Sequence, residues 1–187
     1  MIDVALNFLT EELNEYLQTA YPTHEAWAVL SSRVSQNALA AAQIENKVSL
    51  TLVNLEPEST PSTLSGERLG AGGEVLRINP GISMNLLVLV AANFIDYGES
   101  LKFLTATLTF FQGRNVFTPQ NSPRLAPAFE RLELELVPTS YQDWSFLWGM
   151  LGGQYTPGAV YRLRLLTIQD SQAPENTPVI QSIAINS

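Results

Sequence analysis

The sequence predicts an α/β (α+β) fold in which an N-terminal amphipathic helix and two further helices pack on a mixed β-sheet. Three observations predict it: an apolar stripe at helical spacing near the N-terminus, short segments of alternating apolar and polar residues, and helices between the strands of the second half. The 187 residues suffice for one domain with its own core. We expect that domain at 1–170, including a long flexible loop at 56–81 rich in Pro, Gly, Ser and Thr, followed by a tail at 171–187.

The first helix is predicted from an apolar stripe with a period of 3.6 residues. The stripe consists of Ile2, Ala5, Leu6, Leu9, Leu13, Tyr16 and Leu17. The other faces carry Asp3, Asn7, Glu11, Glu12, Asn14 and Glu15. Pro22 biases Tyr21 away from helical backbone, so we expect the helix to end near Ala20.

Several segments of the first half are strand-like. Residues 26–31 are predicted as a short strand, whereas 34–43 fits either an Ala-rich helical turn or a connection. Apolar and polar residues alternate over 47–52, which indicates a half-buried strand. Residues 83–94 are almost continuously apolar, which is typical of a central strand covered on both faces.

A second helix is predicted to begin at Asp96, because Asp96 and Glu99 form a capping-box pattern. Gly113 is placed to end this helix in the left-handed conformation. The predicted buried face carries Leu101, Leu104, Leu108 and Phe111, with Phe103 and Phe110 flanking it.

A third helix is predicted from a second capping-box pattern, Ser140 with Asp143, and from the Gly152-Gly153 pair that would end it. Its apolar residues at i, i+3, i+4 and i+7 are Trp144, Leu147, Trp148 and Leu151. We interpret the two tryptophans as core residues rather than as a ligand platform, because two indoles supply most of the area that a short helix can bury.

Two strands of alternating leucines carry paired charges on their polar faces. Glu133 and Glu135 lie in one of them, and Arg162 and Arg164 have the same spacing in the other. Paired carboxylates also occur in glycosidases. The matching arginines favour a ladder of ion pairs between parallel neighbours, which would act as a register device or an interface patch.

Composition excludes several classes of function. The absence of cysteine excludes disulfides and thiolate metal sites. A net charge of −8 disfavours nucleic acid as a partner. No apolar run approaches the roughly 20 residues of a membrane helix, so we expect no direct membrane insertion. The opening MIDVALNF lacks the features of a secretory signal, so we expect cytoplasmic synthesis.

Catalytic chemistry is not predicted. His24 is the only histidine and has no neighbours that would complete a triad or a metal site. The GAGG at 70–73 lacks the Lys-Ser/Thr and the strand-to-helix context of a phosphate loop. We therefore predict no enzyme activity, no cofactor and no metal.

The segment TFFQGRNVFTPQNSP, residues 109–123, joins the second helix to the next strand. Its two prolines restrict the backbone, and Asn121 and the serine after it can form side-chain turns, so we expect an ordered connection. Two placements of Phe117 are open: on a contact surface beside Arg114 and Gln120, or in the core.

The longest patterned stretches are NLLVLVAANF, YGESLKFLTATLTFFQGRNVFTPQNSP and LELELVPTSYQDWSFLWGMLGGQYTPGAVYRLRLL. Together with IDVALNFLTEELNEYL and NKVSLTLVNLEPE, they resemble the tube-terminator (cap) family of phage-tail-like contractile injection systems. The resemblance covers most of residues 1–168 and implies a tail-terminator-like fold.

The resemblance also implies a structural, non-enzymatic function. Such caps form a homo-hexamer ring on the end of the inner tube distal to the baseplate, end tube and sheath growth, and anchor the last sheath ring. The implied partners are the inner tube protein and the sheath protein, with assembly in the cytoplasm. The alternatives are a baseplate or tube adaptor subunit of the same particle, or a small-molecule or peptide-binding module.

Interface residues are expected in three places. These places are the connection after the second helix, the arginine pair, and the C-terminal VIQSIAINS. We expect the last of these to be added as a strand to a neighbouring subunit. The expected interface residues are Arg114, Phe117, Gln120, Asn121, Arg162, Arg164, Val179, Ile180 and Ile183.

Overall fold

The computed structural model describes residues 1–23, 25–32, 42–58, 66–69, 75–78, 82–152, 155–168 and 175–177. The chain divides into two compact units. The first comprises Met1–Glu56 and Asn85–Leu166, and the second comprises Pro57–Met84 and Thr167–Ser187.

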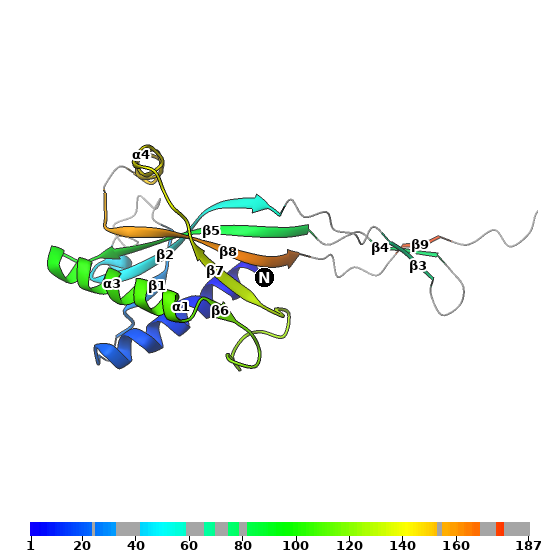
Figure 1. Ribbon diagram of the computed structural model, residues 1–187, viewed down its shortest axis with the longest axis horizontal. Coiled ribbons are helices and arrows are strands. Elements are labelled where there is room, and N and C mark those ends of the chain that lie inside the picture. The colour runs from blue at the N-terminus through cyan, green and yellow to red at the C-terminus, as the bar shows by residue number, and fades with distance from the viewer. Residues whose placement is uncertain are drawn as a thin grey trace, which may run out of the picture. The chain divides into compact units, whose positions relative to one another are not determined.

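A mixed six-stranded sheet forms the centre of the first unit (Figure 1). In spatial order its strands are β1 (Ala28–Leu30), β2 (Lys47–Pro57), β5 (Ile82–Asn93), β8 (Gly158–Ile168), β7 (Leu132–Leu136) and β6 (Val116–Phe117). β1 runs parallel to β2, whereas β7 is antiparallel to both β6 and β8. The predicted mixed sheet is thus confirmed.

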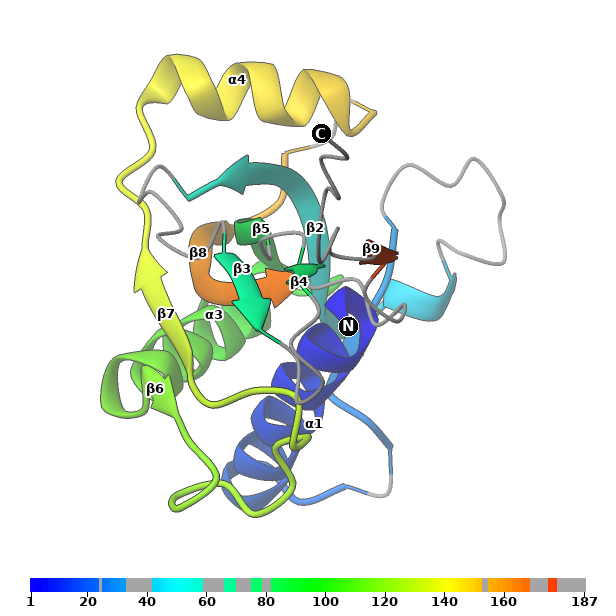
Figure 2. The same ribbon diagram turned by 90° about the vertical axis from the view of Figure 1, so that its right-hand side faces the viewer.

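Three helices cover this sheet from both sides (Figures 1 and 2). α1 (Ile2–Ala20) and α3 (Tyr97–Gly113) lie on one face, and α4 (Tyr141–Met150) lies on the other. The three predicted helices are confirmed, including the end of the first at Ala20.

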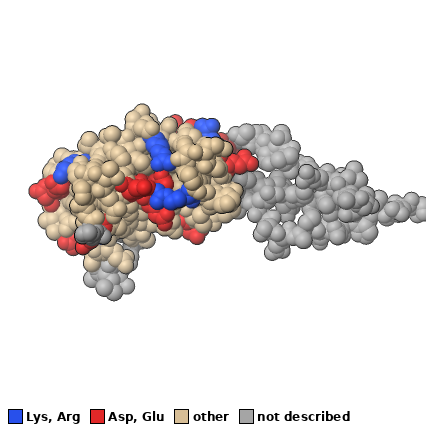
Figure 3. All heavy atoms as spheres, turned by 90° about the horizontal axis from the view of Figure 1, so that it is seen from below, with Lys and Arg blue, Asp and Glu red and all other residues tan. Residues whose placement is uncertain are grey.

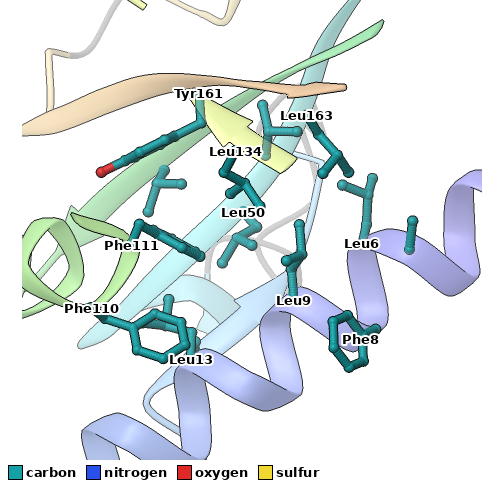
Figure 4. Close-up of a cluster of buried hydrophobic side chains, with 14 of the residues drawn as sticks. Leu6, Phe8, Leu9, Leu13, Leu50, Phe110, Phe111, Leu134, Tyr161 and Leu163 are labelled. Carbon is teal, nitrogen blue, oxygen red and sulfur yellow. The ribbon is translucent and has the colours of Figure 1, made fainter. Parts of the chain in front are cut away.

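The main core lies between α1, α3 and the sheet (Figure 4). The leucines of α1 point towards side chains from β2, β7 and β8, and the phenylalanines of α3 close the same layer. Its labelled members are Leu6, Phe8, Leu9, Leu13, Leu50, Phe110, Phe111, Leu134, Tyr161 and Leu163. Burial of this apolar surface, worth roughly 25 cal/mol per Å², holds both helices on the sheet.

The second core lies under α4. Trp148 is buried there with Leu89 and Val160, and Trp144 stacks on it with ring centroids 5.9 Å apart. The interpretation as a core residue is confirmed for Trp148, whereas Trp144 is only partly buried and packs against this core.

The start of β2 is covered more fully than its alternating sequence predicts. Ser49 and Thr51 are buried as well as the apolar residues between them. Their hydroxyls donate to the carbonyl oxygens of Ala91 (3.4 Å) and Ser31 (2.7 Å). The prediction of a half-buried strand is therefore wrong here, because hydrogen bonds to neighbouring backbone allow polar side chains to be buried.

The buried face of α3 also differs from the prediction. Phe103, Thr107 and Phe110 are buried, whereas Leu101 is 43% exposed. Phe103 stacks on Phe94 with ring centroids 4.3 Å apart. The aromatic side of the helix therefore faces the core, and of the predicted face only its last residue is fully buried.

Both predicted helix starts are confirmed. The Asp96 carboxylate accepts a hydrogen bond from the Glu99 N–H (2.8 Å) at the start of α3. The Ser140 hydroxyl accepts one from the Asp143 N–H (3.1 Å) at the start of α4. Each side chain satisfies a backbone donor that the helix itself leaves free.

The two helix ends differ. Gly152, expected to help end the third helix, follows α4 with φ +101°, a conformation that favours glycine. α3 ends at Gly113 as predicted, but the left-handed conformation expected of Gly113 is wrong, because Gly113 does not have a positive φ. The residue that caps the helix end is Arg114, with φ −141° and ψ 77°.

The second unit contains a three-stranded antiparallel sheet. Its strands are β3 (Gly66–Leu69), β4 (Val75–Ile78) and β9 (Glu175–Thr177), in that order. The strands lie in the segments expected as a long loop and a tail, and each is too short for alternation to reveal it. The domain boundary at 170 stays a prediction.

Candidate functional site

The connection between α3 and β7, residues 114–131, is an ordered segment that we call the connector. The Asn121 side chain donates to the Val116 carbonyl (2.9 Å) and accepts from the Thr118 N–H (2.8 Å). Leu125 and Phe129 are buried in the main core. The expectation of an ordered connection is confirmed.

Phe117 lies in the core rather than on a contact surface. Its side chain is 0% exposed and meets the ring of Phe8 edge-on, with centroids 5.4 Å apart. The two-residue strand β6 pairs with β7 and directs Phe117 inwards, so the ring has no surface to offer a partner. Of the two placements open from the sequence, the core is the observed one, and Phe117 is withdrawn from the expected interface.

Arg114 ties the connector to α1. Its guanidinium donates to the Glu12 carboxylate, to the Asn121 carbonyl (2.8 Å) and to the Ser122 hydroxyl (2.7 Å). It also lies 4.9 Å from the centre of the Phe117 ring, a cation–π contact. The side chain keeps 35% exposure, and its contact with a partner subunit stays a prediction.

Glu12 is the buried centre of this arrangement. Its side chain is 4% exposed and pairs with both Arg114 and Arg124, the latter at 2.9 Å. Arg124 also pairs with Glu15, and this hydrogen bond, followed by the charges of Glu12 and Glu15, raises the pKa of Arg124. We call these four residues the Glu12 cluster.

The Glu12 cluster was missed by sequence reasoning, which placed Glu12 on a polar face of the first helix. The available signal was its position three residues after Leu9 and one before Leu13, at the border of the apolar stripe. Figure 3 shows acidic and basic side chains in contact on the side of the molecule that carries α1.

The loop tip beyond the cluster is solvent-exposed. Gln120 and Asn121 are both exposed, although the Asn121 carboxamide is engaged within the connector. Their expected contact with a partner stays a prediction.

The predicted charges lie opposite one another on neighbouring strands, but the strands are antiparallel and only Glu135 forms ion pairs across them. Glu133 lies opposite Arg164, and Glu135 opposite Arg162, between antiparallel β7 and β8. The expected parallel pairing is wrong. After α4 the chain returns beside the C-terminal end of β7, so β8 begins there and runs in the opposite direction. The Val137 N–H donates to the Val160 carbonyl (2.8 Å) at this point.

The arginines of the ladder are paired within the chain. Arg162 lies 3.4 Å from Glu56 and 3.6 Å from Glu135, and Arg164 also contacts Glu135. Their side chains are 28% and 43% exposed. The interpretation as a register device is consistent with this pairing, and a role of Arg162 and Arg164 in an interface stays a prediction.

Four expectations lie wholly or mostly outside the described residues. They concern His24, the helical turn or connection at 34–43, the GAGG motif at 70–73, and the C-terminal group of Val179, Ile180 and Ile183. Within the described residues, no three His, Asp or Glu side chains are grouped as a metal site would require. No helix of the described part is long and apolar enough to span a bilayer.

The family of the chain follows from a sequence comparison. The profile of the Pvc16 N-terminal domain matches residues 5–182. The chain belongs to this family. No curated protein matches the sequence. Two solved structures are similar to this member of the family in fold.

One of the two is the cryo-EM structure of the anti-feeding prophage cap, described as the AFP tube terminating cap. It shares 12% identity at a TM-score of 0.61, with 100% of this chain and 61% of that chain covered. The other is the PVC sheath/tube terminator of an extracellular contractile injection system in the extended state. It shares 11% identity at a TM-score of 0.50, with 95% of this chain and 64% of that chain covered. The chain thus spans less than two thirds of either structure, and the tail-terminator-like fold expected from the sequence is confirmed.

Proposed function

We propose that this chain is the cap domain that terminates the tube of a contractile injection system. The observation that carries the proposal is the fold: all 187 residues align with the AFP tube terminating cap, and the family profile matches residues 5–182. The second similar structure is also a sheath/tube terminator. Two terminators with low identity to this chain share one fold with it, which favours the same structural role.

The proposed assembly is a homo-hexamer ring that binds the inner tube protein on one side and the sheath protein on the other. A ring of identical chains closes when each copy offers two different, complementary surfaces to its neighbours. The connector tip at Gln120 and Asn121 and the partly exposed Arg114, Arg162 and Arg164 are the side chains that we propose for these surfaces. Assembly is proposed to take place in the cytoplasm.

The proposed activity is binding alone, without catalysis. The support is that both similar structures are caps. The alternative of a ligand-binding module requires the two tryptophans to line an open pocket. Burial of Trp148, which is only 6% exposed, does not favour that alternative.

The proposal is tested by electron microscopy of particles from cells that lack this protein. A terminator predicts tubes or sheaths of uncontrolled length, or sheaths that fail to stay extended. The control is the same strain supplied with the intact chain, which restores a uniform length. Particles of normal, uniform length without the protein would overturn the proposal.

A further inference from the structure

One edge of the six-stranded sheet is incomplete. β6 pairs only with Leu132 and Glu133 of β7, and the next bond on that side runs from the Leu134 N–H to the Asn115 carbonyl (2.8 Å). Figure 2 shows β6 beside only the lower part of β7. Beyond Asn115 the chain has turned away into α3, so β7 continues without a neighbouring strand there.

The unpaired backbone groups belong to Leu136. Successive residues of a strand direct their N–H and C=O to opposite sides, so Leu136 directs both to the same outer side as Leu134. The Val137 N–H, by contrast, donates to Val160 of the strand that follows α4. Among the described residues no partner is found for the outward N–H and C=O of Leu136, which leaves an open edge.

A groove of about 770 Å³ follows this edge. One wall is formed by the last turns of α3 with Leu108 and by Leu134 and Leu136, the last of which is 52% exposed. The other wall carries Glu135 and Arg164. A strand added here would therefore meet an apolar wall on one face and a charged wall on the other.

Arg164 adds a free donor to the charged wall. Its terminal nitrogen pairs with Glu135, but its Nε–H is buried and has no hydrogen-bond partner among the described residues. A buried donor of this kind is unfavourable unless an acceptor reaches it. An incoming polar side chain or carbonyl would supply that acceptor.

On the opposite edge of the sheet, the outward backbone groups of Ala28 in β1 are already engaged. The Asn14 carboxamide accepts from the Ala28 N–H and donates to the Ala28 carbonyl, both at 2.7 Å, on the outer side of β1. Side chains that occupy edge groups in this way prevent pairing with another strand. The outward groups of Ala28 are therefore unavailable to an added strand, unlike those of Leu136.

We propose that the open edge of β7 binds residues 179–185 of a second copy of this chain as an added strand. This inference rests on the proposed ring and names one contact between its subunits. The segment VIQSIAI is rich in β-branched residues, and no charged residue occurs between 176 and 187. Strand addition to an exposed edge is a common mode of recognition, in which backbone bonds give affinity and alternate side chains give specificity.

The more apolar face of the segment suits the apolar wall of the groove. In an extended chain Val179, Gln181, Ile183 and Ile185 share one face, and three of these four side chains are apolar, whereas Ile180, Ser182 and Ala184 share the other. Ser182 lies on the other face, where its oxygen is an acceptor for the Arg164 Nε–H. The match also sets which residues should be neighbours across the contact.

The proposal is tested by disulfide trapping, for which the absence of native cysteine is an advantage. A full-length Leu136→Cys variant is mixed with full-length variants that carry Val179→Cys, Ile183→Cys or Ile185→Cys. We expect a mixed disulfide-linked dimer for at least one of these, because same-face residues of paired strands have Cβ atoms about 4.5 to 5.5 Å apart. Ser182→Cys is the matched control, and it should not link because its side chain points to the opposite wall.

Three results would overturn the proposal. One is the absence of any mixed dimer. Another is a Ser182→Cys yield equal to that of the same-face variants, which indicates random collision. The third concerns a variant that carries Leu136→Cys and one of the C-terminal cysteines in the same chain. A disulfide that forms only within single chains of this variant would show that the segment binds its own copy.

A second variant tests the role of the backbone. Leu136→Pro removes the outward N–H without removing a bond to β8. Proline is tolerated in an edge strand at a position whose N–H points away from the sheet. With no cysteine introduced, we expect the proline to weaken association between copies, measured by sedimentation, about tenfold. Leu136→Thr, which keeps the N–H, should leave it nearly unchanged. Equal association of the two variants, with melting temperatures like that of the parent, would contradict strand addition.

Failure of this inference is distinguishable from failure of the proposed function. The trapping uses purified protein, whereas termination is scored on particle length. Normal capping without trapping removes the strand contact only. Trapping without an effect on particle length removes the capping role and keeps the contact.

Discussion

At the scale of single residues, Glu12 is the buried carboxylate on which the ion pairs of α1 depend. Its carboxylate is 4% exposed and is paired with Arg114 and Arg124, both of which keep some contact with water. Removal of one member of a buried ion pair is costly because the remaining charges lose a partner. Water around the arginines reduces that cost.

Glu12→Gln is expected to lower the free energy of unfolding by about 1 to 3 kcal/mol. Urea unfolding followed by circular dichroism would measure the change. The matched control is Glu15→Gln in the same helix, whose side chain is 65% exposed and should contribute less than about 1 kcal/mol. Equal effects of the two substitutions would show that burial of Glu12 is not important.

Tyr161 gives a second prediction, for alkaline pH. Burial raises the pKa of Tyr161 to about 12, from an ordinary value of 10.0. As the pH rises, the unfolded chain therefore releases this proton before the folded chain does. The neutral phenol contributes its full stability below about pH 10, and this contribution is lost as the pH rises towards 12.

Tyr161→Phe should reduce the alkaline loss of stability by about 1 to 3 kcal/mol between these limits. The urea midpoint measured from pH 9 upwards, compared with that of the parent, reports the difference. Tyr155→Phe, at a residue 68% exposed, is the control for loss of a hydroxyl. If the urea midpoints of the parent and of Tyr161→Phe fall in parallel as the pH rises, the raised pKa of Tyr161 is contradicted.

At the scale of elements, two glycines should respond to alanine in opposite ways. A Cβ on Gly158, at the start of β8, would lie 2.6 Å from the Val90 carbonyl oxygen of β5. A Cβ on Gly149, within α4, would meet nothing within 4 Å. Close backbone approach thus requires glycine at the first position but not at the second.

Gly158→Ala should destabilise the fold by about 1 to 3 kcal/mol, through a clash that the backbone must relieve. Gly149→Ala should stabilise it by about 0.5 to 1 kcal/mol, because alanine is the better helix former. Thermal unfolding of both variants measures the difference. A loss of stability in both would indicate that Gly149 is constrained by something other than its own helix.

The sequence predicts those elements best whose signals are local. The caps at Asp96 and Ser140 lie within three residues of their partners, and both helix starts are correct. The buried face of α3 was not predictable in this way. Its leucines and phenylalanines form competing stripes, and contact with Phe94, the residue after β5, selects the aromatic one.

Features that depend on distant residues could not be derived from the sequence. The partners of Glu12 lie 102 and 112 positions further along the chain. The charge ladder was predicted from spacing, but its antiparallel direction depends on where α4 returns the chain to the sheet. The open edge of β7 likewise depends on the shortness of β6.

At the scale of the whole molecule, the C-terminal segment is expected to serve association rather than folding of the first unit. Deletion of 171–187 removes β9, whereas deletion of 178–187 leaves all described strands in place. We expect the shorter deletion to keep the melting temperature of the first unit and to weaken association between copies, measured by sedimentation. Unchanged association of the deleted chain would count against a role of this segment.

The central claim is that the chain caps the tube, and its position along the particle tests this most directly. Cryo-EM of particles that carry a tagged copy of the chain would locate it. Our account predicts density for a single ring at the tube end distal to the baseplate. Density at the baseplate, or repeated along the tube, would contradict it and would favour an adaptor or a tube subunit.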